Sequence, residues 1–291
     1  MSRIAYVNGR YLPHAGAAVH VEDRGFQFAD GVYEVCEIRD GTIVDPTLHL
    51  DRLERSLSEL RMGMPMSRAA LLVVLREMAK RNRVRDGGVY IQVTRGEAPR
   101  DHAFPPAGTP MTVVMTAKPH DRAKAEALAE HGVSVVTVPD ERWARVDIKS
   151  VGLLPNCLAK QTAKEAGAKE AWFVDATGFV TEGSSTNAWI VTADGRLVTR
   201  PAEFGILRGI TRTVLMKVAE KLGLTVEERA FTVAEAQAAR EAFISAATTL
   251  VMPVVSIDGR PVANGAPGTV ARELRRAYHD STERLPLATS R

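Results

Sequence analysis

Short apolar segments joined by two-residue turns are the feature of this sequence that most limits what it can fold into. Asn8-Gly9 separates two apolar segments, and Asp40-Gly41 and Asp258-Gly259 repeat the arrangement. Such pairs favour the tight turns of antiparallel hairpins. Helical segments occur between the hairpins, but helices and strands do not alternate steadily along the chain. The sequence therefore predicts an α+β fold rather than a doubly wound parallel sheet.

The first long helix is expected to begin at Pro46, with Asp45 as its N-cap. Leucines then recur at helical spacing, at Leu50, Leu53, Leu57 and Leu60. Further helices are expected from Ser67 to Arg81, from about Leu154 to Ala166, from Ile210 to Leu222 and in the late segment TVARELRRAYH. The polar tail after Ser281 is expected to be frayed.

A chain of 291 residues is long for one compact core, so two domains are expected. We expect a smaller α+β N-terminal domain over residues 1–120 and a larger α+β C-terminal domain over residues 133–291. The segment between them, residues 121–132, is polar and rich in alanine, and we interpret it as the inter-domain connection.

Charge and cysteine content exclude several function classes. The 38 basic and 35 acidic side chains nearly balance, so neither nucleic acid nor an anionic membrane is an expected partner. No run approaches the ~20 apolar residues of a membrane span. Cys36 and Cys157 have no metal-ligand spacing, so no metal is expected; a bridge between them stays open, although a reduced compartment is the simpler interpretation. The expected protein is soluble and cytoplasmic.

Four features carry the chemistry. They are Lys149 in DIKS, Glu182 in VTEGSSTN, Gly209-Ile210-Thr211 in GILRGITR, and Arg52 in HLDRLERS. Singly, each has an ordinary explanation: a solvated lysine, a turn cap, a helix start and a surface charge. Arg52, however, has no acidic residue three or four positions away that would pair with it on a helix. Together the four meet the needs of pyridoxal phosphate: an amine for its aldehyde, an anion for its ring nitrogen and donors for its phosphate.

The segments DIKS…LLPNCLAKQTAKEAGAKEAWFVD, VTEGSSTNAWIV and GILRGITR resemble the class IV, fold-type IV, pyridoxal-phosphate aminotransferases, in the family's order. The resemblance implies a two-domain fold of the D-amino acid aminotransferase type. It implies that Lys149 forms the Schiff base with pyridoxal 5′-phosphate and moves the substrate's α-proton, and that Glu182 faces the ring nitrogen. The cofactor's phosphate would be bound by Arg52, by Ile210 and Thr211 at a helix start, and by the backbone of Ala247. Arg142 is a weaker candidate for the ring's phenolate oxygen.

Two further segments, GVYEVCEIRDG and VTRGEAPRDHAFP, resemble the D-alanine enzymes of this family. The resemblance implies that Tyr33, Arg100 and His102 bind the substrate carboxylate, with Thr248 nearby. It also implies a homodimer in which loop 95–106 reaches the neighbouring active site. The expected reaction is ping-pong transamination between a D-amino acid, of the D-alanine or D-glutamate type, and a 2-oxo acid. Each residue also has an ordinary alternative, a polar loop or a packed tyrosine, and His49 is expected to be a surface histidine.

Other functions stay open at this stage. The same scaffold serves branched-chain aminotransferases, (R)-amine aminotransferases and aminodeoxychorismate lyase, which releases pyruvate without an oxo-acid acceptor. The Arg100-x-His102 pair argues against the lyase. A protein of a different class, one that binds a phosphate-bearing ligand without catalysis, would keep the fold but yield a colourless preparation.

Overall fold

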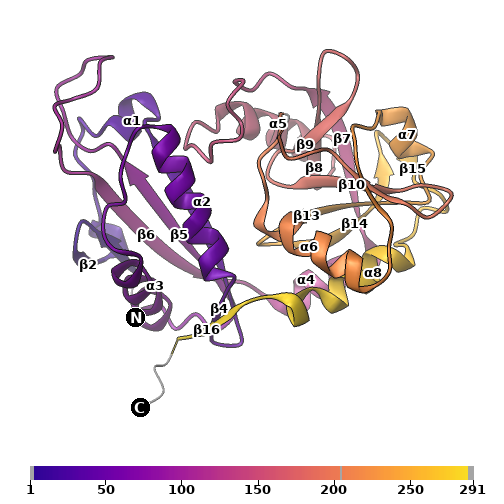
Figure 1. The fold of residues 1–291 in the computed structure, drawn as a ribbon, viewed down its shortest axis with the longest axis horizontal. Coiled ribbons are helices and arrows are strands. Elements are labelled where there is room, and N and C mark those ends of the chain that lie inside the picture. The colour runs from indigo at the N-terminus through magenta and orange to yellow at the C-terminus, as the bar shows by residue number, and fades with distance from the viewer. Residues whose placement is uncertain (1–2, 204, 288–291) are drawn as a thin grey trace. The chain divides into compact units, whose positions relative to one another are not determined.

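The structure is a computed structural model that describes residues 3–203 and 205–287. The chain divides into two compact units. Within the described residues, the first unit comprises 3–121, 148–152 and 283–287, and the second comprises 122–147, 153–203 and 205–282. Each unit is built on its own β-sheet. Figure 1 colours the chain from indigo at its N-terminus to yellow at its C-terminus.

The sheet of the first unit has the strand order β16-β4-β3-β5-β6-β1-β2, and the pairings among the described residues are antiparallel. Its strands are β1 Ile4–Val7, β2 Arg10–Pro13, β3 Gly31–Arg39, β4 Thr42–Val44, β5 Gly87–Thr94, β6 Thr112–Pro119 and β16 Arg284–Pro286. Its helices are η1 His14–Gly16, α1 Arg24–Phe28, α2 Pro46–Glu59 and α3 Arg68–Arg81.

The predicted hairpin turns occur where expected. Asn8 and Gly9 join β1 to β2, and Asp40 and Gly41 join β3 to β4. Both residues of each turn have positive φ, 46° and 87° in the first and 50° and 71° in the second, as a type I′ turn requires. The pairing of β3 with β5 then places Tyr33 opposite Gln92.

Helices α2 and α3 lie against this sheet (Figure 1), and most of their leucines are buried in the core between helices and sheet. Leu53, Leu57, Leu71 and Leu75 have no solvent exposure, which is the outcome that their helical spacing predicts. Pro46 is the first helical residue, as expected. Asp45 precedes it but makes no side-chain cap within the described chain, because its carboxylate accepts the N–H of Glu283 at 2.9 Å instead.

The expectation of a frayed tail is wrong for the residues just after Ser281. Strand β16 pairs with β4, with Leu285 opposite Ile43. Since β4 would otherwise be a sheet edge with unpaired backbone groups, a short added strand satisfies it. Residues 283–287 therefore belong to the first unit.

The sheet of the second unit has the order β12-β11-β10-β13-β14-β7-β8-β9, with β15 added beside β14. Parallel pairs join β11 to β12, β14 to β7 and β7 to β8. The strands are β7 Val133–Pro139, β8 Glu170–Val174, β9 Val180–Gly183, β10 Asn187–Val191, β11 Leu197–Thr199, β12 Val226–Glu228, β13 Glu241–Ala246, β14 Leu250–Ile257 and β15 Arg260–Pro261. The helices are α4 Arg122–His131, α5 Leu154–Glu165, α6 Ile210–Lys221, α7 Val233–Gln237, α8 Thr269–Ala277 and η2 Tyr278–Ser281.

The observed division differs from the expected domain boundaries in two places besides the C-terminal segment. The segment interpreted as a connection contains α4, which buries Ala129 in the core of the second unit and so is part of that unit. Residues 148–152, which include Lys149, belong to the first unit rather than to the C-terminal one. These residues belong there because Ser150 forms a β-bridge with Val32 and Ile148 packs in the core of the first unit.

Over the described ranges, none of the helices is long and apolar enough to cross a bilayer. Cys36 is buried and Cys157 is exposed, and both are free thiols.

Candidate active site

Lys149 lies against strand β3 of the first unit. Its backbone carbonyl accepts the N–H of Tyr33 at 2.9 Å, and its own N–H donates to the hydroxyl of Ser56 at 3.3 Å. The Lys149 Nζ is 4.2 Å from the centroid of the Tyr33 ring, within the range of a cation–π contact. The structure thus brings together two of the residues that the sequence nominated, an amine and a phenol.

The Tyr33 ring also packs against an aromatic ring on the neighbouring strand β5. It stacks on Tyr90 with ring centroids 5.6 Å apart, and the Tyr90 hydroxyl donates to Gln92 at 2.7 Å. Burial raises the pKa of Tyr90 to about 12, and the nearby Tyr33 adds to this effect. Tyr90 therefore stays protonated at neutral pH, and Tyr33 has a fixed ring to pack against.

Arg52 is not the solvated surface charge that its type usually is. The Glu34 carboxylate accepts its Nε at 2.7 Å and its Nη2 at 2.9 Å, and accepts the ring Nδ1 of His49 at 2.8 Å. Burial alone would raise the pKa of Glu34, but Arg52 and then His49 hold that pKa far below its ordinary range. The same carboxylate keeps the pKa of Arg52 raised despite its burial. A planar guanidinium is thereby fixed on α2.

His49 corrects an expectation, because it is buried rather than on the surface. Its position on α2, one turn before Leu53, points it at the sheet rather than at solvent. Glu34 was not nominated from the sequence at all. The signal that could have found it is its place between the buried Val32 and Cys36 on the apolar side of an alternating strand, where a carboxylate needs a cationic partner.

Arg100 and His102 are exposed and gather at one aromatic ring. The Arg100 Cζ is 5.0 Å from the centroid of Phe28, and the His102 ring is 5.5 Å from it. The middle of this loop is anchored by Arg24, whose Nη1 donates to the carbonyl of Asp101 at 2.6 Å. The guanidinium and the imidazole of this loop thus both pack against Phe28.

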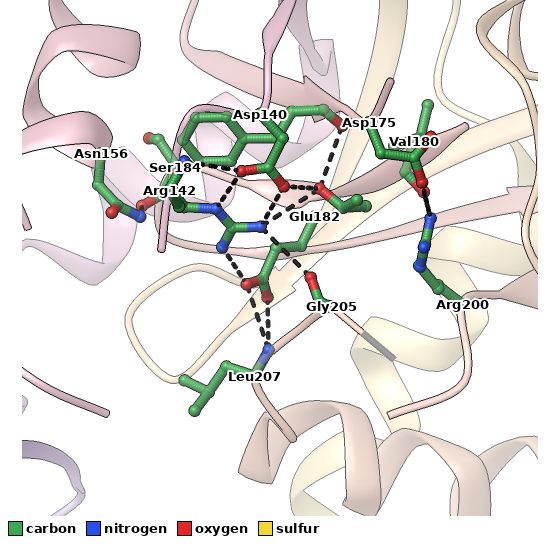
Figure 2. A network of polar contacts seen from close by, with 12 residues as sticks. Asp140, Arg142, Asn156, Asp175, Val180, Glu182, Ser184, Arg200, Gly205 and Leu207 are labelled. Atoms are coloured by element: carbon green, nitrogen blue, oxygen red, sulfur yellow. Dashed lines mark hydrogen bonds and ion pairs between the residues drawn. The ribbon is translucent and has the colours of Figure 1, made fainter. Parts of the chain in front are cut away.

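Glu182 lies at the centre of a polar network in the second unit (Figure 2). One of its oxygens accepts the Nη1 of Arg142, and the other accepts the amide of Asn187 at 3.1 Å. Both accept the N–H of Leu207 at 3.2 Å. Arg142 in turn donates its Nε and Nη2 to Asp140, at 2.9 and 2.7 Å. The carboxylate is thus fixed on three sides by residues from three segments.

Asn187 also ties Glu182 to the start of α6. Its amide donates to the carbonyl of Leu207 at 3.1 Å. Gly209, the N-cap of α6, approaches it so closely that a Cβ there would lie 2.1 Å from Asn187 Oδ1. A side chain at position 209 would therefore displace the Asn187 amide from the start of α6. The position of Gly209 agrees with its assignment from sequence to a helix start.

The hydroxyl cluster that follows Glu182 has a structural role that sequence reasoning missed. The buried Glu170 accepts the hydroxyls of Ser184, Ser185 and Thr186, and also the Nζ of Lys160 at 3.1 Å. A buried carboxylate so satisfied fixes the turn between β9 and β10. The serines and threonine are thus turned toward Glu170.

Helix α6 begins at Ile210, as predicted, and both Ile210 and Thr211 are buried. The Thr211 hydroxyl is buried and has no hydrogen-bond partner among the described residues. Strand β13 packs beside α6, and the turn after it contains Ala247, half-buried, and Thr248, exposed. In that turn the hydroxyl of Thr249 is also buried and lacks a partner in the described chain.

Two orphaned hydroxyls and the free N–H groups of a helix start are the features of an anion site. Thr249 is thus a functional candidate that sequence reasoning missed, since it named the two preceding residues of the same turn. No sequence signal separates the three positions, because their exposure depends on how the turn between β13 and β14 closes.

Comparison with known proteins places these residues in a family. Residues 31–257 match the family described as Amino-transferase class IV. The D-alanine aminotransferase of Bacillus licheniformis is 42% identical over 274 residues, covering 94% of this chain and 95% of the relative. In fold, the branched-chain amino acid aminotransferase of Escherichia coli superposes with a TM-score of 0.90 at 24% identity, over 99% of this chain and 100% of that one. A hypothetical aminotransferase from Mycobacterium tuberculosis, solved in a PLP-bound form, gives 0.81 at 25% identity, over 95% and 98%.

Proposed function

The chain belongs to the class IV aminotransferases, and from this membership we propose that it exchanges amino groups between D-amino acids and 2-oxo acids. The substrates are of the D-alanine and D-glutamate type. A D-amino acid leaves its amino group on the enzyme and departs as a 2-oxo acid. A second 2-oxo acid then takes up that amino group, so that the two half-reactions follow a ping-pong order. Support comes from the D-alanine aminotransferases, which align over nearly the full length of both chains.

The cofactor is pyridoxal 5′-phosphate, and the pair of buried, unpartnered hydroxyls is the observation that carries this assignment. Thr211 and Thr249 offer donors at a helix start and a neighbouring turn, which fits a phosphate group. When bound, the cofactor supplies an aldehyde that accepts amino groups and a ring that stabilises negative charge at the substrate's α-carbon.

We assign the phosphate to Arg52, to the backbone N–H groups of Ile210 and Thr211, and to the backbone of Ala247. Arg52 brings a charge whose plane Glu34 fixes through two hydrogen bonds. A preset guanidinium binds a phosphate with less loss of side-chain entropy than a mobile one.

Lys149 is assigned as the amine to which the cofactor's aldehyde attaches. It also takes the α-proton from the substrate and returns it to the product. Glu182 is assigned to the ring nitrogen, where its negative charge holds a proton on that nitrogen. The network around Glu182 supports this role, because Asn187 and Leu207 fix the carboxylate without a charge of their own.

Substrate recognition is assigned to Tyr33, Arg100 and His102, with Thr248 nearby. Arg100 can bind a carboxylate through two charge-assisted hydrogen bonds, and the phenol and imidazole add donors. Fixing the carboxylate relative to Lys149 decides which enantiomer presents its α-proton to the amine.

The proposal includes a homodimer in which loop 95–106 completes the active site of the neighbouring subunit. Phe26 on α1 is 77% exposed and Phe104 in the loop itself is 53% exposed, which is consistent with a surface that is covered in the dimer. The proposal also includes a cytoplasmic location, which two free cysteines in 291 residues favour.

Spectral titration of the purified holoenzyme tests the function. D-alanine should convert the bound cofactor from its aldehyde form to its amine form, and L-alanine should do so far more slowly. Pyruvate or 2-oxoglutarate should then reverse the change. Borohydride should link the cofactor to the wild-type chain at Lys149 and should leave the Lys149→Ala variant unlabelled.

Faster conversion by L-leucine or by an (R)-arylalkylamine would assign the enzyme to another branch of the family. Pyruvate release from aminodeoxychorismate without an acceptor would identify a lyase. A colourless protein that borohydride does not label would rule out the whole proposal.

A further inference from the structure

Arg142 lies between the carboxylates of Asp140 and Glu182 and bonds both of them (Figure 2). The two oxygens of Asp140 accept the Nε and Nη2 of Arg142, and its Oδ2 also accepts the hydroxyl of Thr181 at 2.8 Å. The Nη1 of Arg142 donates to Glu182. The three charged side chains expose only 13%, 5% and 7% of their surfaces in the order Asp140, Arg142, Glu182.

The order of charges in this row is acid, base, acid, and its formal sum is −1 + 1 − 1 = −1. Arg142 makes three bonds to Asp140, through its backbone N–H, Nε and Nη2, and one to Glu182. Partial burial would raise the pKa of Asp140, but hydrogen bonds and charge from Arg142 lower it. Asp140 is therefore ionised at neutral pH and accepts more of the hydrogen bonds of Arg142 than Glu182 does.

A lone arginine beside Glu182 would compete directly with a protonated ring nitrogen. A guanidinium stays charged at any physiological pH, so it would neutralise the carboxylate on which the ring proton depends. With Asp140 present, Arg142 can orient Glu182 without cancelling its charge. The neighbouring pair Arg200 and Asp175, 2.8 Å apart, balances its own charges.

We propose that Asp140 is a positioning residue that keeps the cofactor's ring nitrogen protonated, by drawing the charge of Arg142 away from Glu182. This inference rests on the proposed role of Glu182. We call the row Asp140, Arg142 and Glu182 the relay. In it, Asp140 does not contact the ring but sets how strongly Glu182 holds the ring proton.

The relay predicts different outcomes for Asp140→Asn and Arg142→Met. Asp140→Asn turns the formal sum from −1 to 0 and leaves Arg142 to neutralise Glu182, so the ring nitrogen should lose its proton. Arg142→Met removes the competing cation, so the ring nitrogen should keep its proton. A purely structural role would make both variants shift the ring in the same direction.

The measurement is the ¹⁵N NMR signal of pyridoxal phosphate labelled at its ring nitrogen and bound to each variant at one fixed pH near neutrality. Wild type should give the protonated signal and Glu182→Gln the deprotonated one. Asp140→Asn should move toward the deprotonated signal and slow the D-alanine half-reaction about tenfold, the equivalent of one pKa unit, at little changed half-saturating D-alanine. In the Arg142→Met background, Asp140→Asn should have no further effect.

Asp175→Asn is the matched control, since it removes a carboxylate that pairs with Arg200 rather than with Arg142. Its ring signal should equal that of wild type. A protonated ring in Asp140→Asn, or a deprotonated ring in Arg142→Met, would overturn the relay while leaving Glu182 in place. A protonated ring in Glu182→Gln would instead overturn the proposed role of Glu182 itself. Should Asp140→Asn fail to fold, a deprotonated ring in Arg142→Met would still overturn the relay.

Discussion

At the scale of single residues, Glu34 places a negative charge in the first unit with no exposed surface. The charge is tolerated because Arg52 and His49 fill its acceptor sites. A buried ion pair does not by itself stabilise a fold, but the loss of one partner leaves the other charge without compensation. Replacing Glu34 would therefore remove the carboxylate that compensates the charge of Arg52.

Glu34→Gln should lower the free energy of unfolding by about 3 kcal/mol at pH 7. Because the folded pKa of Glu34 lies below its ordinary value of 4.5, its contribution is complete above about pH 4.5 and is lost as pH falls below it. The difference between variant and wild type should therefore shrink in acid. Urea unfolding at pH 7 and at several lower pH values measures both effects.

Glu54→Gln provides the control for that experiment. Glu54 also pairs with an arginine, Arg68, but half of its side chain is exposed. An exposed pair contributes little, so this variant should stay within about 1 kcal/mol of wild type at each pH. Equal losses in the two variants would mean that burial of Glu34 has no energetic consequence.

At the scale of elements, local sequence signals predicted most of what the structure contains. The Asn-Gly and Asp-Gly turns and the leucine spacing of α2 appear as expected, because both depend on contacts a few residues apart. The segment interpreted as a connection contains helix α4, and the tail expected to be frayed contains strand β16. Their partners, β14 and β4, lie more than a hundred residues away in sequence, and local patterns carry no record of them.

The start of helix α8 is capped by a side chain that is distant in sequence. Its N-terminal N–H groups, those of Val270 and Ala271, donate to the two oxygens of the buried Glu241 on β13, both at 3.0 Å. Gly268 is the N-cap, and a Cβ there would lie 1.9 Å from the Glu241 Cδ. The carboxylate both satisfies the helix start and balances its dipole.

Gly268→Ala should therefore destabilise the protein by roughly 1–3 kcal/mol, because the methyl group displaces Glu241 from the helix start. The backbone conformation of Gly268, φ −79° and ψ 172°, suits alanine, so the loss would be steric alone. Gly63→Ala is the matched control, since a Cβ at Gly63 meets nothing within 4 Å in the described structure. Thermal unfolding of the two variants should separate them clearly, and similar melting temperatures would contradict the packing argument.

At the scale of the whole molecule, the nominated site residues come from both units. Tyr33, Arg52 and Lys149 belong to the first, and Glu182 and Thr211 to the second. The sequence could nominate them because each lies in a motif with its own chemical logic. It could not place Lys149 in the first unit, because that placement follows from the bridge between Val32 and Ser150 rather than from chain order. It likewise could not find Asp140 or Glu34, whose roles depend on partners from other segments.

The proposed exchange of loop 95–106 between subunits can be tested by mixing two inactive variants, Lys149→Ala and Arg100→Ala. If each active site takes its lysine from one chain and its loop arginine from the other, a hybrid dimer contains one site in which both are wild type. Co-expressed and purified through two different tags, the hybrid should recover about half of the wild-type rate with D-alanine, since one of its two sites is intact. If Arg100 instead serves the site of its own chain, neither site of the hybrid has both residues, and its activity should stay at the level of the variants alone. The Arg100→Ala parent should still convert a carboxylate-free amine, because such a substrate makes no use of the guanidinium. Equal losses on both kinds of substrate would show that Arg100 supports the loop rather than the substrate.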